Sequence, residues 1–181
     1  MKYVALIRAI NVGGNSVISM AELKRMVESL GHTEVTTYIQ TGNVVFATPS
    51  PDRVELAKAL EAKLQTRMKY EAKVFILTPD ELQAASRHNP YGEPDDHQVQ
   101  VMFLDTPPQP DRVEKLLAMA GNEYKFSVWE RVLYYSYPKQ VGIGRRTAAG
   151  NRRTINFEKV LGVVGTARNI KVVNKLIELA R

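Results

Sequence analysis

The sequence predicts an α+β protein, because segments with strand and helix periodicity alternate along its 181 residues. Two observations support this. Residues 2–77 follow the order strand, helix, strand, strand, helix, strand, and residues 98–137 repeat the first four of these elements. The first order is that of the ferredoxin-like fold, a four-stranded antiparallel sheet backed by two helices. We expect a ferredoxin-like half at residues 1–78 and a second, partly similar α+β half at 79–181 that ends in helices, the two halves packing separately or as one domain.

In the first half, each element follows from apolar spacing and capping residues. A short apolar run predicts a buried strand at residues 2–10. Ser19 and Glu22 form a capping-box pattern before a helix that Gly31 ends. Alternation predicts strands at 34–39 and 44–48, joined by a turn at 41–43. Pro51 predicts the start of a second helix, before a strand at 72–77; the apolar stripe of that helix is Val54, Ala57, Leu60, Leu64 and Met68.

In the second half, Thr78 begins a capped helix that links the two halves. Turn residues crowd positions 89–96, before a strand at 98–104 and a helix at 111–120 with Val113, Leu116 and Leu117 directed inward. A hairpin is predicted at 124–128 and 132–137, and helices at 157–161 and 171–180. The Gly- and Arg-rich residues between 138 and 154 predict a loop.

Composition and charge exclude several classes of function. The chain has no cysteine, which excludes disulfides, thiol chemistry and thiolate zinc sites. Its first apolar run is too short for a signal peptide or a membrane span, so we expect a cytoplasmic protein with no membrane partner. Residues 139–181 hold ten Lys/Arg and two Asp/Glu, a charge of +8, whereas the other residues sum to −2. This basic excess indicates an anionic partner, or simply a solvated basic face.

Two polar segments follow predicted strands. In the first, Arg8 and Asn11 precede Gly13 and Gly14, whose backbone N–H groups can cradle a phosphate or carboxylate. The second, Gln40-Thr41-Gly42-Asn43, offers several donors and acceptors in one turn. Neither matches a P-loop or a dinucleotide fingerprint. Each is also explained as a tight turn that requires glycine dihedrals.

These segments resemble one family. Residues 3–14, 20–23 and 37–46 are similar to the widespread bacterial domain-of-unknown-function family numbered 1697, and the likeness continues at 89–90, 101–104, 142–144 and 166–169. The resemblance implies an α+β protein with ferredoxin-like topology, located in the cytosol, and no named activity. This chain departs from the family pattern at Ile170, where the pattern has tryptophan, and at 152–154, where it has a Lys-Leu-Thr-like segment.

Further candidate residues lie in the basic C-terminal segment. Thr166 or Asn169 is expected to cap the last helix, and Arg168 either lies in that cap or joins Arg8 around an anion. The arginine pairs Arg145-Arg146 and Arg152-Arg153 can contact the phosphates of a nucleic acid. Aromatic residues near them can stack on bases or belong to the hairpin core; they are Trp129, Tyr134, Tyr135 and Tyr137.

Catalytic motifs are lacking in the sequence. His32, His88 and His97 show no metal-ligand spacing, and residues 95–97 are typical of an exposed turn. We therefore expect no metal and no cofactor. The leading hypothesis is non-catalytic binding of an anionic ligand, either nucleotide-like or a nucleic acid, through the Gly/Asn turns and the arginines. The alternatives are an enzyme of unknown reaction with its site at the same turns, and an interaction protein that oligomerises through sheet edges or helices.

Overall fold

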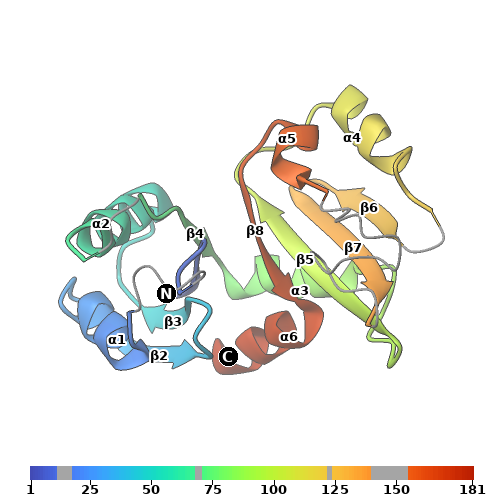
Figure 1. Ribbon diagram of the computed structural model, residues 1–181. Coiled ribbons are helices and arrows are strands. Elements are labelled where there is room, and N and C mark those ends of the chain that lie inside the picture. The colour runs from blue at the N-terminus through green and yellow to red at the C-terminus, as the bar shows by residue number, and fades with distance from the viewer. Residues whose placement is uncertain (12–17, 68–70, 122–123, 140–154) are drawn as a thin grey trace. The chain divides into compact units, whose positions relative to one another are not determined.

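A computed structural model of the protein describes residues 1–11, 18–67, 71–121, 124–139 and 155–181 (Figure 1). The described chain forms two four-stranded sheets in which every strand pairing is antiparallel. It divides into two units, one made of Met1–Ala84 with Val173–Arg181 and the other of Ala85–Val172. The α+β class predicted from the sequence is confirmed. The domain division expected between residues 78 and 79 stays a prediction.

The first unit has the predicted ferredoxin-like topology, with the strand order β2-β3-β1-β4. The elements are β1 (Lys2–Ile7), α1 (Met20–Glu28), β2 (Thr33–Tyr38), β3 (Asn43–Ala47), α2 (Arg53–Gln65) and β4 (Val74–Leu77). Alternate residues of β1 face α1 and α2, and the core on this side contains Ala5, Ile7, Val44, Phe46, Leu23, Val27, Leu60 and Leu64. Val4 and Leu6, on the opposite face of β1, are fully buried as well.

Capping residues explain where the first helix begins. The Ser19 hydroxyl accepts a hydrogen bond from the Glu22 amide at 3.1 Å, which satisfies one of the unpaired N–H groups at the start of α1. The Glu22 carboxylate does not complete the capping box as predicted. It accepts a hydrogen bond from Arg67 Nε at 2.6 Å, so it joins the start of α1 to the chain just beyond α2.

Two sequence-based boundaries in this unit were wrong. β1 ends at Ile7 and not at residue 10, because Ala9 and Asn11 have φ values of 56° and 58° and interrupt the extended backbone. The helix α2 begins after Asp52, whose carboxylate caps it, so Pro51 precedes the cap. Its buried stripe is Leu56, Leu60 and Leu64, whereas Val54 is 62% exposed.

The second unit repeats the topology of the first, with the strand order β6-β7-β5-β8. Its elements are β5 (His97–Leu104), α4 (Pro110–Leu117), β6 (Lys125–Trp129), β7 (Val132–Pro138), α5 (Phe157–Leu161) and β8 (Gly165–Asn169). The predicted hairpin is present as β6 and β7. Leu116 is buried as expected, but Leu117 is 43% exposed. The sequence predicted only the order strand, helix, strand, strand for this half. The structure adds the helix α5 and the strand β8, so all six elements of the first unit recur.

The strand β8 is the element that sequence reasoning missed. Residues 166–169 were expected to cap the last helix, but they pair with β5, with Arg168 opposite Val101 and Asn169 opposite Gln100. The strand is short and half polar, so it lacks the apolar run that predicts a buried strand. Its pairing with β5 supplies the fourth strand of the sheet.

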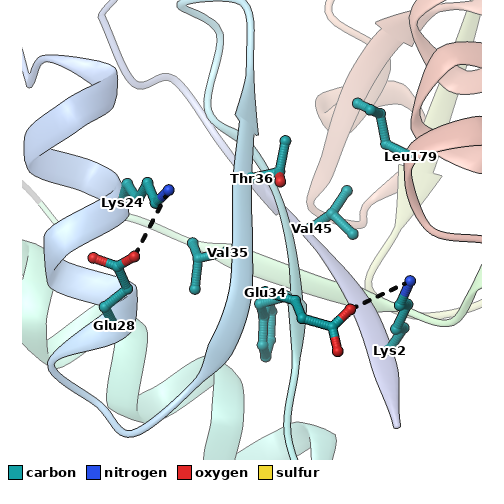
Figure 2. Close-up of a pocket in the computed structure, with 9 residues that line it drawn as sticks. Lys2, Lys24, Glu28, Glu34, Val35, Thr36, Val45 and Leu179 are labelled. Atoms are coloured by element: carbon teal, nitrogen blue, oxygen red, sulfur yellow. Dashed lines mark ion pairs between the residues drawn. The ribbon is translucent and has the colours of Figure 1, made fainter.

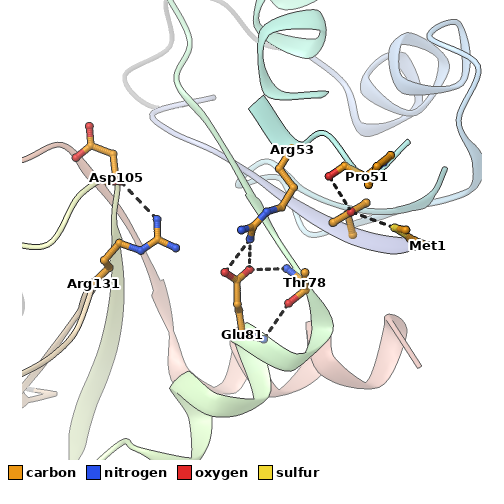
Figure 3. A network of polar contacts seen from close by, with 8 residues as sticks. Met1, Pro51, Arg53, Thr78, Glu81, Asp105 and Arg131 are labelled. Atoms are coloured by element: carbon orange, nitrogen blue, oxygen red, sulfur yellow. Dashed lines mark hydrogen bonds and ion pairs between the residues drawn. The ribbon is translucent and has the colours of Figure 1, made fainter. Parts of the chain in front are cut away.

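In the sequence, each set of four strands is followed by one further helix. The first, α3 (Pro79–Arg87), begins with a complete capping box: Glu81 N donates to Thr78 Oγ1 at 3.1 Å, and Thr78 N donates to Glu81 Oε2 at 2.8 Å. Arg53 Nη1 donates to both Glu81 oxygens at 2.7 Å (Figure 3). This ion pair fixes the start of α3 against the start of α2.

The second of these helices is α6 (Ile170–Leu179). Residues 173–181 belong to the first unit, although they follow the second unit in the sequence. There Lys2 Nζ donates to the Arg181 carbonyl oxygen at 2.5 Å, and Leu176 is fully buried. The end of α6 is thus an integral part of the first unit.

Candidate functional site

The two polar turns that follow β1 and β2 lie next to each other. Asn11 Nδ2 donates to the Gln40 carbonyl oxygen at 3.1 Å, and Ile7 N donates to the Gly42 carbonyl oxygen at 2.8 Å. Gly42 has a φ of +74°, and a Cβ at this position would lie 2.3 Å from Ile10 Cγ2. The turn therefore requires glycine both for its backbone conformation and for its close packing.

The polar side chains of these turns bind backbone groups. Asn11 Oδ1 accepts from Ile18 N at 2.8 Å, while its Nδ2 donates to the Ile18 carbonyl oxygen at 2.9 Å. Asn43 is fully buried, and its Nδ2 donates to the Tyr38 carbonyl oxygen and to Thr41 Oγ1, both at 2.9 Å. These contacts favour the structural explanation of both turns.

The other residues predicted to bind a ligand at the two turns differ in their exposure. Gln40 and Thr41 are exposed, and Arg8 is half-buried. Gly13 and Gly14 lie outside the described residues, so the glycine cradle stays a prediction.

Arg168 is held inside the second unit. It is only 7% exposed, and its Nη1 donates to Thr166 Oγ1 and to the Ala167 carbonyl oxygen, both at 2.8 Å. Burial lowers the pKa of its guanidinium to about 10. The side chain is therefore still charged at neutral pH. Arg8 belongs to the first unit, and an anion site shared by the two arginines stays a prediction.

A hollow of about 100 Å³ surrounds Asn169 in the second unit. We call it the Asn169 hollow; its polar lining residues are Glu93, His97, Gln98, Lys139, Asn169 and Lys171. Asn169 Nδ2 donates to Gln98 Oε1 at 2.7 Å, and Asn169 Oδ1 accepts from Lys171 N at 2.9 Å. The second contact is the helix cap expected of Asn169. The asparagine is thus fixed between β5 and the start of α6.

Residues 95–97 hold the opposite side of the hollow in place. His97 Nδ1 lies 2.9 Å from Asp96 Oδ1, and the hydrogen bond from His97 lowers the pKa of the Asp96 carboxyl group. Lys139 N donates to the Asp96 carbonyl oxygen at 2.9 Å, and Lys139 Nζ donates to the Asp95 carbonyl oxygen. Residues 95 and 96 bend as predicted, whereas His97 is the first residue of β5. These contacts position a histidine and a lysine at the hollow.

Sequence reasoning found Asn169 but missed the other polar residues of this lining. They come from four separate segments, namely the chain before β5, β5 itself, the residue after β7 and the start of α6, and the pairing of strands in one sheet brings them together. The spacing of these residues along the sequence does not indicate that they share one hollow. The only usable signal was the basic excess after residue 138.

Charged side chains of both signs line the Asn169 hollow. Lys139 and Lys171 each contribute an ammonium group, and the start of α6 adds the positive end of a helix dipole. Glu93 is an opposing charge in the lining, and the Asp96 carboxylate adds a second beside His97 and Lys139. Among the residues the structure describes, no group of three or more His, Cys, Asp or Glu side chains could hold a metal ion.

The structure describes only some of the residues predicted to bind a nucleic acid. Arg145, Arg146, Arg152 and Arg153 lie outside the described residues. Tyr134, Tyr135 and Tyr137 are buried, which favours their assignment to the hairpin core. Trp129 stacks on His88, with ring centroids 3.9 Å apart and an interplanar angle of 7°. One face of the indole is thus occupied within the protein.

Comparisons with known proteins agree with this architecture. A family model described as "Protein of unknown function (DUF1697)" matches residues 1–134. The conserved bacterial protein SP0830 from Streptococcus pneumoniae is similar in structure, with a TM-score of 0.73 and 20% sequence identity over 99% of this chain and 98% of that one. At this identity the likeness shows the fold. A search of curated proteins gives no significant match. No helix in the described part of the chain is long and apolar enough to cross a membrane.

Proposed function

Since the chain belongs to the DUF1697 family of proteins of unknown function, we propose that it binds a small anionic ligand, without transforming it, in the Asn169 hollow. The observation that carries the proposal is the convergence of Lys139, Lys171 and the start of α6 on one hollow that Asn169 and Gln98 hold rigid. A phosphate or a carboxylate is the group that this arrangement suits.

The expected affinity follows from the magnitudes of these contacts. A helix N-terminus favours an anion by about 0.3–1 kcal/mol, and each exposed lysine adds at most about 1 kcal/mol. A Kd of 1 mM requires about 4 kcal/mol. Inorganic phosphate alone is therefore expected to bind at millimolar concentration or more weakly. A physiological ligand needs further groups, such as a nucleoside, to bind tightly.

We restrict the proposal to binding because of the side chains in the lining. The Asp96–His97 pair can accept or deliver a proton. The described lining, however, offers no hydroxyl or thiol group beside His97 to act as a nucleophile.

The test is an amide NMR titration with inorganic phosphate and, separately, adenosine monophosphate. Binding should shift the amide signals of residues 97–98, 139 and 169–171. Lys139→Gln and Lys171→Gln should each weaken binding about fivefold, as expected when an ion pair of about 1 kcal/mol is lost. Lys115→Gln is the matched control, because Lys115 is an exposed lysine of the same unit that pairs with Asp111.

Equal affinities in all three variants would contradict the site, and so would the absence of shifts at high millimolar phosphate. A nucleic acid is the second anionic ligand that the basic excess after residue 138 supports. A single-stranded oligonucleotide bound there should lose affinity steeply as salt rises. Oligonucleotide binding unaffected by Lys139→Gln and Lys171→Gln would place the nucleic acid elsewhere on the protein.

A further inference from the structure

The two sheets have four edge strands, β2 and β4 in the first sheet and β6 and β8 in the second. The N–H and C=O groups on the outer side of an edge strand can pair with another chain, and folded proteins usually obstruct them. Within the described residues, β2, β4 and β8 each carry such an obstruction, whereas β6 does not. The edge at β6 is therefore the one that is suited to a partner.

β4 and β8 are obstructed by a glutamate at the same place in the two units. Val74 N, at the start of β4, donates to Glu61 Oε1 at 2.8 Å. Gly165 N, at the start of β8, donates to Glu158 Oε1 at 3.0 Å. Each glutamate comes from the helix that precedes the strand. An outer amide that is bound in this way is not available to a further strand.

β2 is obstructed by a bulge. Its register against β3 shifts at residues 33–36, where Glu34 has a φ of 50°. A bulge twists the edge of a sheet and interrupts regular pairing. Figure 2 shows the Lys24–Glu28 ion pair on one side of β2 and the Lys2–Glu34 pair on the other. Charged side chains and an irregular backbone thus coincide at this edge.

β6 has neither device: its register against β7 has no shift, and no described side chain bonds to its backbone. Leu104 N donates to the Arg131 carbonyl oxygen at 2.9 Å, so the odd-numbered residues of β7 bond to β5 and the even-numbered ones bond to β6. Those even-numbered residues pair with the odd-numbered residues of β6. The backbone groups of Phe126 and Val128 are consequently directed away from β7.

The sequence of β6 is complementary to itself in an antiparallel arrangement. A second β6 centred on Ser127 places Phe126 opposite Val128 and Lys125 opposite Trp129, so the whole strand pairs and no like charges meet. Phe126 and Val128 then form an aromatic–β-branched pair, a kind that stabilises sheets. The outward N–H and C=O groups of these two residues in both copies form four intermolecular hydrogen bonds.

We propose that two copies of the protein associate through β6 in this register, about a two-fold axis at Ser127, and join their second sheets into one. The axis is perpendicular to the joined sheet, so α4 of both copies lies on the same face. α4 packs against β6, and Leu117 and Met119, at and just beyond its end, are exposed apolar side chains on that face. The association is independent of the Asn169 hollow, because β8 forms the opposite edge of the sheet.

Sedimentation equilibrium of the full chain, from micromolar to millimolar concentration, measures the oligomeric state. The unmodified protein should become dimeric as its concentration rises. Val128→Pro should weaken the dimer about thirtyfold, because it removes two of the four intermolecular hydrogen bonds. Proline is tolerated on an edge strand where its nitrogen faces outward, so this variant should keep the fold.

A second pair of variants tests the register. Ser127→Lys and Ser127→Glu each place two like charges opposite each other at the axis, so each variant alone should stay monomeric where the unmodified protein dimerises. An equimolar mixture of the two should form the mixed dimer. Thr36→Lys is the control, because Thr36 is an exposed residue of the obstructed strand β2, and it should dimerise as the unmodified protein does.

Three results would overturn the proposal. The first is an unmodified protein that is monomeric at every concentration, and the second is a dimer of unchanged affinity in Val128→Pro. The third is a mixture of Ser127→Lys and Ser127→Glu that associates no better than either variant alone.

Discussion

The side-chain amide of Asn11 donates to the backbone carbonyl of Gln40 at 3.1 Å, and this bond joins the two polar turns that carry the family signature. The same side chain binds both the amide and the carbonyl group of Ile18. One asparagine therefore closes its own loop and ties that loop to the neighbouring turn.

Asn11→Ala should reduce the free energy of unfolding by roughly 2–3 kcal/mol, because three hydrogen bonds of about 1 kcal/mol each are lost. Asn11→Gly relieves the φ of 58° but loses the same bonds, so it should be only slightly less harmful. Urea denaturation of both variants measures the effect. Unchanged stability would contradict the structural role of Asn11.

Gly42→Ala should cost about 2–4 kcal/mol, since the new methyl group would lie 2.3 Å from Ile10 Cγ2 at a φ of +74°. Gly92→Ala is the matched control: its φ is +61°, and a Cβ there meets nothing within 4 Å. It should lose only the backbone contribution, about 1 kcal/mol. Similar losses in the two variants would show that the contact with Ile10 is unimportant.

Leu176→Ala tests whether the end of α6 is needed by the first unit. Leu176 is fully buried, so the substitution should cost about 2–5 kcal/mol. Lys175→Ala, one residue away, should change stability by less than about 0.5 kcal/mol because the Lys175 side chain is 45% exposed. Thermal denaturation of both proteins makes the comparison. A loss in Leu176→Ala no larger than in Lys175→Ala would contradict the assignment.

Stability should fall at alkaline pH because of Tyr134 and Tyr135. Burial raises the pKa of both phenols above the ordinary value of 10.0. Above pH 10 the unfolded chain loses phenolic protons that the folded protein retains, so the stabilisation is complete below that pH and declines as the pH rises. Denaturation between pH 8 and 11 should show this decline, and Tyr135→Phe should reduce its slope. An equal slope in Tyr135→Phe would disprove the contribution of Tyr135.

The sequence predicted the first ferredoxin-like unit well because its strands are apolar runs and its helices carry caps, as at Ser19 and Thr78. It failed at β8, where Thr166, Arg168 and Asn169 interrupt any apolar pattern and only pairing with β5 reveals the strand. It also misjudged Val54 and Leu117. At about 100° per residue, Val54 lies about 240° round the helix from Leu60, and Leu117 lies about 100° from the buried Leu116, so neither shares the buried face.

The candidate site was less predictable than the fold. The composition of the two polar turns predicted a binding site, but the side chains of Asn11 and Asn43 form hydrogen bonds with backbone groups. The Asn169 hollow depends on His97, Lys139 and Lys171, which have no common spacing and meet only when the strands pair. Its prediction would have required knowing the register of β5 against β7 and β8.

The position of residues 173–181 has a consequence for synthesis on the ribosome. These residues are translated after the second unit, yet they belong to the first unit. The first unit therefore lacks this segment until the second unit has been translated. A nascent chain arrested before residue 173 should thus be more sensitive to protease in its N-terminal half than the released protein.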